Sequence, residues 1–392
     1  MFDVIIIGAG IVGAAIARDL SRDGRSVLVI ERSAAASGSS GRGEGNILVS
    51  DKAPGPELDL AIDARRRWPT VARELRGEAD ALGVDIEFEA KGGLVVATTD
   101  IGAQPLLDFA AGQRAVGVRA EAVDSATAHE LEPHLSDGIT AAVWYPDDAQ
   151  VQPAIATEAL LASARRAGGT VRSGVEVLAA LLDDSGAIVG VETSAGEFRA
   201  PVVINAAGPW SGAVSTALGA PIPVRPRRGM VLVTTRMPHR VFHKVYDADY
   251  VGAVGSSSAD LQVSSVVEST ASGTVLIGSS REQVGFRDEF RAEIVSQLAR
   301  RAMLLFPFLG SAAVLRSYSG FRPYMPDHLP VIGPDGRRPG LWHATGHEGA
   351  GIGLSIATSA LIADLLAGRT PSVDPTAFAL DRAGLREHLV AA

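Results

Sequence analysis

The N-terminal segment carries the clearest pattern of apolar and polar positions in the chain. Residues 4–7 form a continuous apolar run, which predicts a parallel strand buried on both faces. Apolar residues then recur at helical spacing over residues 11–22, and residues 26–30 form a second apolar run. A strand, a helix and a second strand in this order are typical of the first unit of a doubly wound α/β sheet.

Three glycines between the first strand and the helix point to a ligand. Gly8, Gly10 and Gly13 form the pattern GxGxxG. The first glycine permits the tight turn, the second lets a pyrophosphate approach the backbone, and the third lets the helix lie close to the strand. Glu31 stands at the end of the second strand, where it would accept hydrogen bonds from ribose hydroxyls. The sequence therefore predicts dinucleotide binding, although this motif alone does not separate FAD from NAD.

Apolar periodicity predicts helices and strands along the rest of the chain. Helices are expected over residues 55–82, 101–134, 152–166, 291–306 and 355–366. Strands are expected over residues 87–98, 139–145, 201–208, 228–235, 262–267, 273–279 and 340–344, with a meander over 170–174, 176–182, 188–193 and 197–200. The strands within residues 224–290 are expected to be antiparallel.

These elements predict an α/β fold in which two domains interleave along the chain. Residues 1–45, 140–220 and 321–392 are expected to build the dinucleotide-binding domain. Residues 46–139 and 221–320 are expected to build the second domain.

Composition and charge exclude several classes of function. The 45 acidic and 36 basic residues give a net charge of −9, which argues against a nucleic-acid or anionic-membrane partner. The chain has no cysteine, which excludes disulfides, iron–sulfur clusters and cysteine-linked cofactors. No apolar stretch approaches the roughly 20 residues of a membrane span, and the N-terminus has no cationic signal region. We expect a cytoplasmic protein without an integral membrane segment.

A second glycine-rich turn favours FAD over NAD. Gly349, Gly351 and Gly353 lead into the apolar helix near the C-terminus. The N-terminus of that helix would place a positive dipole end beside the pyrimidine edge of a reduced flavin. FAD is long enough to need this second anchor at its ring, and the chain carries no further GxGxxG motif for NAD(P)H. We therefore expect non-covalently bound FAD that oxidises a small molecule directly.

Four segments in the right order resemble the D-amino-acid oxidase family, and within it the glycine oxidase branch. They read DVIIIGAGIVGAAIA…VLVIE, VVINAAGPWSG, SGFRPYMPDHLPVIG and GHEGAGIGLSIATSALIADLL. The resemblance covers nearly the whole chain. It implies a glutathione-reductase-like Rossmann domain for FAD, interleaved with an α+β substrate domain built on a large antiparallel sheet. It also implies oxidation of a C–N bond next to a carboxylate.

The implied reaction needs no catalytic side chain. A hydride passes from the carbon that bears the amine to flavin N5, and water hydrolyses the resulting imine, so the protein mainly orients the substrate. Arg322 matches the carboxylate-binding arginine of the family, and its planar guanidinium suits a bidentate contact. A surface ion pair with Asp327 is the alternative for this residue.

Other side chains are candidates for the substrate pocket. They are Tyr246, Tyr250, Tyr324, Glu348, Arg42 and Lys244. The tyrosines could equally be core residues, and Glu348, at a departure from the glycine oxidase pattern, could hold a substrate ammonium, contact the flavin or cap a helix. Arg42 could grip a second carboxylate or a flavin phosphate. His343 and His347 lie four residues apart without a third ligand in register, so no metal is expected.

The glycine motifs and the family resemblance together assign a set of residues to FAD. They are Gly8, Gly10, Ile11, Val12, Gly13, Glu31, Arg32, Ser39, Ser40, Arg42, Gly43, Glu44, Gly45, Asn46, Val175, Ala206, Ala207, Gly208, Trp210, Arg322, His347, Glu348, Gly349, Gly351, Ile352 and Gly353.

The expected activity is oxidation of an amino acid or an N-substituted glycine, with oxygen or another electron acceptor. A specific hypothesis is an N-carboxymethyl amino acid of natural-product biosynthesis, which would yield glyoxylate and a free β-amino acid. The alternatives are a 2-hydroxy-acid dehydrogenase with His347 as its base, or the flavin subunit of a hetero-oligomeric dehydrogenase. The sequence is also compatible with a homo-oligomer.

Overall fold

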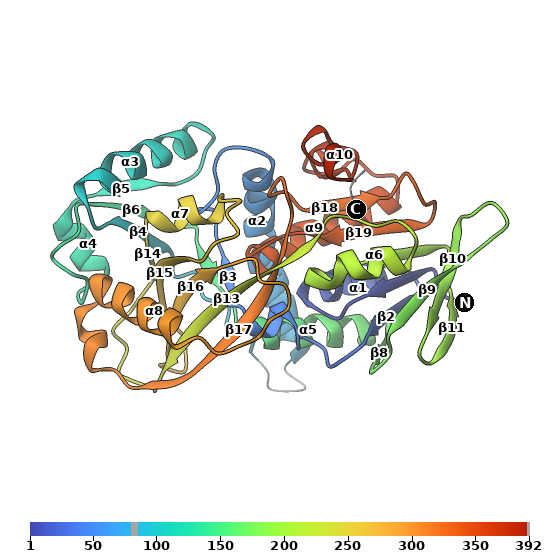
Figure 1. The fold of residues 1–392 in the computed structure, drawn as a ribbon, viewed down its shortest axis with the longest axis horizontal. Coiled ribbons are helices and arrows are strands. Elements are labelled where there is room, and N and C mark those ends of the chain that lie inside the picture. The colour runs from blue at the N-terminus through green and yellow to red at the C-terminus, as the bar shows by residue number, and fades with distance from the viewer. Residues whose placement is uncertain (80–84, 390–392) are drawn as a thin grey trace.

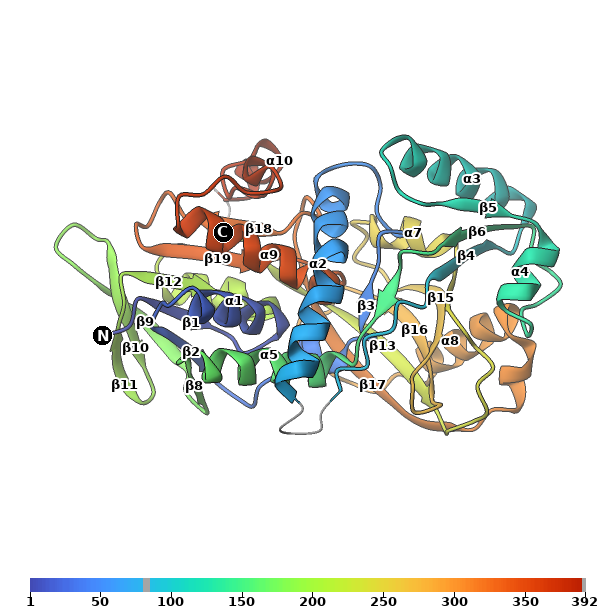
Figure 2. The same ribbon diagram turned by 180° about the vertical axis from the view of Figure 1, so that it is seen from behind.

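The protein, seen in a computed structural model that describes residues 1–79 and 85–389, has two lobes (Figures 1 and 2). The long helix α2 (Pro56–Ala79) lies between the lobes in both views. The last residues of the helix predicted over 55–82 fall outside the described part of the chain. The N-terminus and the last helix, α10 (Ala383–Leu389), belong to the same lobe.

The lobe that holds the N-terminus is built on a six-stranded sheet with the order β18-β19-β12-β1-β2-β8. Its strands are β1 (Val4–Ile7), β2 (Val27–Glu31), β8 (Thr170–Ser173), β12 (Val202–Asn205), β18 (Val331–Pro334) and β19 (Leu341–Thr345). All neighbouring strands are parallel except β18 and β19.

Both faces of this sheet are covered, which explains the continuous apolar run of its first strand. One face, with Val4 and Ile6, packs against α1 (Ile11–Arg22), α5 (Pro153–Arg166) and α9 (Gly351–Leu366). The other face, with Ile5 and Ile7, packs against a small sheet and against α6 (Ser211–Ala217). The small sheet consists of β9 (Val177–Leu182), β10 (Ile188–Thr193) and β11 (Gly196–Arg199).

The second lobe contains an eight-stranded sheet with the order β17-β13-β16-β15-β14-β4-β6-β5. Its strands are β4 (Gly93–Ala97), β5 (Glu121–Val123), β6 (Ala141–Tyr145), β13 (Arg225–Thr234), β14 (Lys244–Asp247), β15 (Gln262–Ser269), β16 (Val275–Arg281) and β17 (Val314–Tyr324). The pair β14 and β4 is parallel, and the other pairs are antiparallel. Helix α8 (Ala292–Leu305) packs on one face through Ile294 and Leu298.

Shorter elements connect the lobes. Strands β3 (Asn46–Ile47) and β7 (Ala149–Gln150) pair with each other where the chain passes between the lobes. Short 3₁₀ helices lie at Ser39–Arg42, Gly208–Trp210, Pro307–Ser311 and Pro375–Phe378.

Several predicted elements differ from the observed ones. The single helix expected over 101–134 is instead α3 (Asp100–Ala115), β5 and α4 (Ser125–Leu131). Gly117 follows α3 with a φ of +90°, a conformation that ends a helix. The strand expected over 170–174 belongs to the six-stranded sheet beside β2, not to the meander. Strand β14 and helix α7 (Asp249–Val254) were not predicted.

Strand pairing also bears on where one domain ends and the next begins. Strand β6 pairs with β4 in the eight-stranded sheet, although residues 140–220 were expected to belong to the cofactor domain. We therefore propose a domain boundary near residue 150, just after β7.

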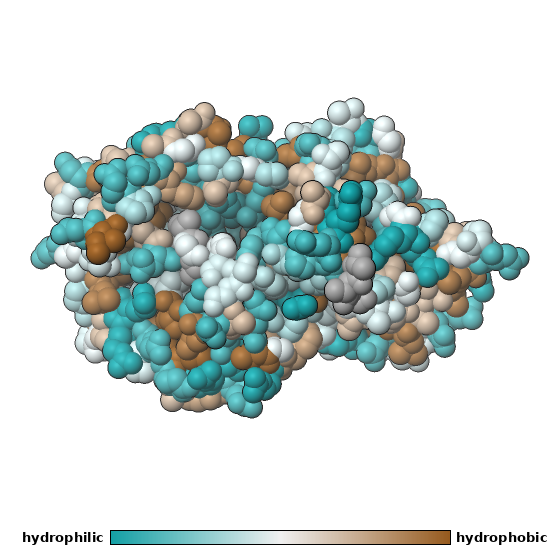
Figure 3. Space-filling view, turned by 45° about the horizontal axis from the view of Figure 1, so that its top comes forward, coloured by the Kyte–Doolittle hydropathy of each residue, from teal (hydrophilic) through white to brown (hydrophobic). Residues whose placement is uncertain are grey.

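The surface is mainly polar on the face shown in Figure 3, where apolar residues are scattered in small groups. In the part of the chain that the structure describes, no helix combines the length and the apolar character needed to cross a membrane.

Candidate active site

A cavity of about 720 Å³ lies where the two lobes meet. The residues predicted to bind FAD supply most of its wall, from the first glycine turn, the loop after β2, the end of β12 and the start of α9. Of the predicted residues, those on the wall are Gly8, Gly10, Ile11, Val12, Glu31, Arg32, Ser39, Ser40, Arg42, Gly43, Glu44, Gly45, Asn46, Val175, Ala206, Ala207, Gly208, Trp210, Tyr250, Arg322, His347, Glu348, Gly349, Gly351 and Ile352.

The first glycine turn is closely packed against its neighbours. Gly8 has a φ of +111°, and a Cβ atom there would lie 2.5 Å from the carbonyl oxygen of Ala206. Gly13 does not line the cavity, but a Cβ atom on it would collide with the carbonyl oxygen of Gly8. These positions therefore require glycine so that α1 begins directly above β1, with its N-terminus at the cavity.

Glu31 is held in place at the end of β2. Its carboxylate accepts hydrogen bonds from the backbone N–H groups of Ala9 and Ser33, each at 2.9 Å. Because Glu31 lines the cavity and a carboxylate has further lone pairs, it can also accept from a ribose hydroxyl. Ser40 accepts a hydrogen bond of 2.9 Å from the N–H of Ile11. This bond holds the 3₁₀ helix Ser39–Arg42, which follows β2, against the start of α1.

The second glycine turn places the start of α9 at the same cavity. Gly349, Gly351 and Ile352 line the wall, whereas Gly353 packs against the backbone of Asn46 and Ile47. The positive end of the α9 dipole therefore faces the cavity, as the flavin hypothesis requires.

His347 lies beneath this turn and is buried. Its Nε2 atom is 3.0 Å from Oγ1 of Thr358. Burial lowers the pKa of the imidazole to about 3, so His347 is neutral at physiological pH. His343 is also buried, 3.1 Å from Asp335. Across residues 1–79 and 85–389, no group of three or more potential ligands could hold a metal ion.

Arg322 extends from the end of β17 and lines the cavity. Its Nη1 atom donates a hydrogen bond of 2.9 Å to the carbonyl oxygen of Ser280. Burial, together with the nearby Arg281, lowers the pKa of the guanidinium to about 10, which still leaves it charged. Gly229 lies directly beside it, and any Cβ atom at that position would collide with Nη1. The Asp327 alternative is not observed, because Asp327 pairs with Arg382.

Glu348 contacts a histidine and an arginine of the protein. It has a φ of +46°, and its carboxylate lies 2.8 Å from Nδ1 of His328 and 3.6 Å from Nη1 of Arg227. Glu348 thus lines the cavity with a carboxylate that is already partly neutralised, and it does not cap α9.

The structure does not bring every predicted substrate residue to the cavity. Tyr250 lines it, but Tyr246, Tyr324 and Lys244 do not. The hydroxyl of Tyr246 donates to Ser50 at 2.6 Å in the core, and the Tyr324 ring lies beside His328.

Lys244 is buried between acidic side chains. Its Nζ atom lies 3.6 Å from Glu44 and 3.4 Å from Glu268, and it also donates to Asn46. Burial raises the pKa of Glu268 to about 7, despite the neighbouring ammonium. The partners of Lys244 in the structure are therefore these protein groups around Glu44.

Arg42 is half-exposed at the rim of the cavity. It pairs with Asp288 at 3.2 Å and donates to the carbonyl oxygen of Ser319 at 2.8 Å. Both acceptors belong to the second lobe, so in this structure Arg42 links the lobes.

Sequence reasoning missed two buried arginines near the site, Arg227 and Arg281. Both are at most 3% exposed. The available signal was an unusual run of cations, because Arg225, Arg227 and Arg228 fall within four residues of an otherwise apolar strand.

A largely parallel sheet covered on both faces, with the N-termini of α1 and α9 at one cavity, is typical of FAD-binding oxidoreductases. The chain matches the FAD dependent oxidoreductase family (DAO) over residues 3–365, and it belongs to that family.

Relatives within the family narrow the comparison. The chain is 30% identical to glycine oxidase from Geobacillus kaustophilus over 384 residues, which covers 97% of each chain. It is 29% identical to hydrogen cyanide synthase subunit HcnC from Pseudomonas aeruginosa, over 96% of this chain and 95% of HcnC. The crystal structure of the Geobacillus glycine oxidase superposes with a TM-score of 0.87 and 29% identity, over 97% of this chain and 98% of that one.

These findings confirm the predicted family, fold class and enzyme class. The protein is an FAD-dependent oxidoreductase that acts on C–N bonds, and FAD is bound non-covalently. The glycine cradle at Gly8 and the N-terminus of α1 fit the pyrophosphate, the carboxylate of Glu31 fits the ribose, and the N-terminus of α9 fits the flavin ring.

Proposed function

We propose that the protein oxidises the C–N bond of an amino acid or N-substituted glycine whose carboxylate is bound by Arg322. The observation that carries this proposal is the Arg322 guanidinium, which lines the FAD cavity and, among the described residues, donates its side-chain hydrogen bond to a carbonyl oxygen and to no acidic group. A half-buried guanidinium in this state favours a bound carboxylate, because a charge-assisted bidentate pair offsets its desolvation.

The described side chains would act by positioning the substrate. FAD, held by the glycine turns and Glu31, would supply the two-electron oxidant for this reaction. Arg322 fixes the carboxylate, so that the adjacent C–H bond is oriented for transfer. The product imine is then hydrolysed by water. Oxygen or another acceptor would complete the cycle.

A specific form of this proposal is an N-carboxymethyl amino acid as substrate, which releases glyoxylate and a free β-amino acid in natural-product biosynthesis. The carboxymethyl group presents the same carboxylate to Arg322 as glycine does. The other part of such a substrate would extend toward the substrate lobe, past Tyr250 and Glu348, which also line the cavity.

The environment of His347 disfavours the 2-hydroxy-acid alternative. Hydroxyl oxidation needs a base at the alkoxide. An imidazole with a pKa of about 3, buried and bonded to Thr358, is too weak a base for this task.

Anaerobic reduction of the flavin tests the proposal. The purified holoenzyme is mixed with glycine, sarcosine, D-amino acids, N-carboxymethyl amino acids and 2-hydroxy acids, and the loss of flavin absorbance is followed. We expect bleaching by one amine class, and a decrease in kcat/KM of about a hundredfold or more in Arg322→Gln with FAD content unchanged. Reduction by 2-hydroxy acids alone, or an Arg322→Gln variant as fast as the wild type, would contradict the proposal.

A further inference from the structure

Three arginines lie close together on neighbouring strands; Arg322 belongs to the cavity wall, whereas Arg227 and Arg281 are buried next to it and do not line the cavity. They are Arg322 on β17, Arg227 on β13 and Arg281 on β16, and the strand order is β17-β13-β16. Arg227 and Arg322 are directly opposite each other in the β13–β17 pairing. Like charges opposite each other on one sheet destabilise it, so the fold maintains this arrangement at a cost.

The acidic side chains present do not neutralise this cluster. Arg227 has one carboxylate partner, Glu348 at 3.6 Å, which is shared with His328. Arg281 and Arg322 have no acidic partner within 4 Å among the described residues; the side-chain contact of Arg281 is to Ser279 at 3.4 Å. Nε and Nη1 of Arg227 also lack hydrogen-bond acceptors there, although Arg227 is fully buried.

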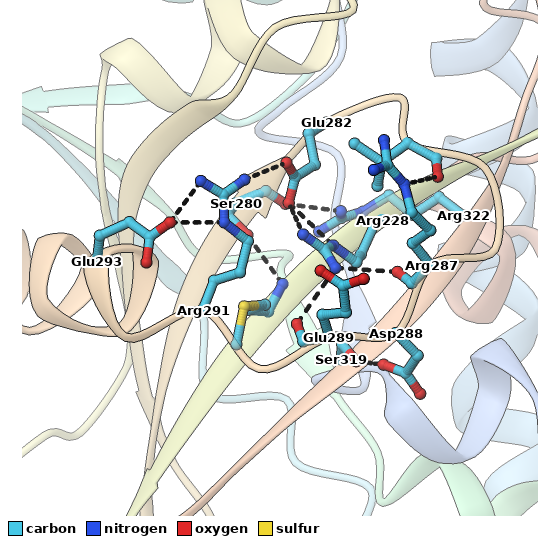
Figure 4. A network of polar contacts seen from close by, with 12 residues as sticks. Arg228, Ser280, Glu282, Arg287, Asp288, Glu289, Arg291, Glu293, Ser319 and Arg322 are labelled. Atoms are coloured by element: carbon cyan, nitrogen blue, oxygen red, sulfur yellow. Dashed lines mark hydrogen bonds and ion pairs between the residues drawn. The ribbon is translucent and has the colours of Figure 1, made fainter.

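The neighbouring Arg228 shows how this sheet satisfies a buried arginine that has a structural role. Its guanidinium bonds to Glu282 at 2.9 Å and to the carbonyl oxygens of Arg287 and Glu289 (Figure 4). Arg291 completes the network through its own ion pair with Glu282. The full set of partners around Arg228 contrasts with the excess positive charge around Arg281 and Arg322.

Arg281 contacts a residue of the cavity wall, which places the excess positive charge close to a bound substrate. Its guanidinium lies over the ring of Tyr250, 4.7 Å from the centroid, and Tyr250 lines the cavity beside Arg322. A ligand that places one carboxylate at Arg322 would bring its remaining part toward Tyr250 and Arg281.

We propose that Arg281, supported by Arg227, forms a second anion site, and that the substrate is therefore a dicarboxylate. The inference rests on the proposed function, in which Arg322 holds the first carboxylate. The second acidic group approaches beside the Tyr250 ring and supplies the negative charge that the arginine cluster lacks. Arg281 is thus the specificity-determining residue, and Arg42 at the rim, paired with Asp288, is not.

Binding of unreactive acids to the holoenzyme tests this site without turnover. Acetate, malonate, succinate and glutarate are titrated while the flavin spectrum is recorded, with calorimetry as a second readout. At least one dicarboxylate is expected to bind the wild type tenfold or more tighter than acetate. In Arg281→Gln this preference should fall below threefold. Arg225→Gln removes the same charge from an exposed position on the neighbouring strand β13 and should keep the full preference.

Thermal stability separates a binding role from a structural role. Removing an uncompensated buried charge should leave the melting temperature of Arg281→Gln unchanged or raise it, whereas loss of a structural contact would lower it. A lowered melting temperature with an intact dicarboxylate preference would overturn the inference.

Substrate reduction distinguishes failure of this inference from failure of the proposed function. If sarcosine and iminodiacetate reduce the flavin equally well, and Arg281→Gln does not change their ratio, the second site is wrong and amine oxidation stands. If no amine reduces the flavin, the proposed function is wrong, and with it the inference that rests on it.

Discussion

His347 shows at the scale of one residue how the cavity constrains chemistry. A histidine beside a flavin is an obvious candidate for a base, and the sequence alone left that role open. In the structure the imidazole is buried and bonded to Thr358, and burial keeps it neutral. Its bond to Thr358 of α9, and the hydrogen bond from the Ala350 N–H to its carbonyl oxygen, indicate that it supports the start of α9.

This burial predicts a specific dependence of stability on pH. In the unfolded chain His347 binds a proton below a pH of about 6.5, whereas the pKa of the folded-state imidazole is about 3. Between these values the unfolded state binds more protons, so His347 weakens the folded state as the pH falls. The contribution is about 1.4 kcal/mol per pH unit below pH 6.5.

Urea unfolding of the holoenzyme and of His347→Gln at pH 7.5, 6 and 5 measures this contribution. As the pH falls, the wild type should lose free energy of unfolding through His347, whereas the variant should not, because glutamine does not titrate. The free energy of unfolding of the wild type minus that of the variant should therefore decrease from pH 7.5 to pH 5. Buried carboxylates such as Glu268 titrate in both proteins and cancel in the difference. A difference in unfolding free energy that is constant across the three pH values would contradict the buried neutral imidazole.

At the scale of elements, the contact between α1 and β1 decides whether the pyrophosphate site exists. Gly13→Ala would drive a Cβ atom into the carbonyl oxygen of Gly8, so α1 must move away from the strand. We expect FAD affinity to fall at least tenfold and the apoprotein to lose about 1–3 kcal/mol of stability. Gly77→Ala on the exposed part of α2 meets no atom within 4 Å and should stabilise the protein by about 0.5–1 kcal/mol.

FAD fluorescence titration and thermal melting of the two variants check this prediction. The substitutions are chemically identical, so the comparison isolates the packing of the glycine. Equal FAD affinity in Gly13→Ala and Gly77→Ala would show that the close approach seen in the structure is not required.

The elements that could be predicted are those whose signal is local. The apolar run of β1, the glycine turn and the periodicity of α1 lie within one continuous segment, and the structure has them at the expected residues. Strand pairing is not local. The strand at 170–174 was expected in a meander because it precedes β9 in sequence, yet it pairs with β2.

The same limit applies to the site. Arg322 and the turn at 347–353 could be predicted because each lies in a motif. Lys244 was expected at the substrate, but its partners Glu44 and Glu268 come from distant segments, and no local pattern shows that they enclose it. Arg281 was missed because its significance depends on β16 lying beside β13, which in turn lies beside β17.

At the scale of the whole molecule, the two lobes together form the wall of one cavity. Trp210 of the cofactor lobe stacks on Phe286 of the substrate lobe with 5.2 Å between ring centroids. The guanidinium of Arg32 covers the Trp210 ring at 4.3 Å, and both of these residues line the cavity. Bound FAD therefore contacts a wall whose aromatic part depends on the second lobe.

Cofactor binding should consequently stabilise both lobes, and the affinity for FAD should depend on Phe286. At FAD concentrations about a hundredfold above the Kd, we expect roughly 2.7 kcal/mol of added stability and a melting temperature that rises with FAD.

Phe286→Ala removes a stacked pair worth about 0.5–1.5 kcal/mol and should weaken FAD binding about two- to tenfold through the loss of support for Trp210. Phe290→Ala truncates a more exposed phenylalanine of the same loop, 67% exposed, and should leave the affinity unchanged. Titration of apoprotein with FAD measures all three proteins. An equal loss in both variants would mean that the loop as a whole, and not the stack on Trp210, supports the cofactor.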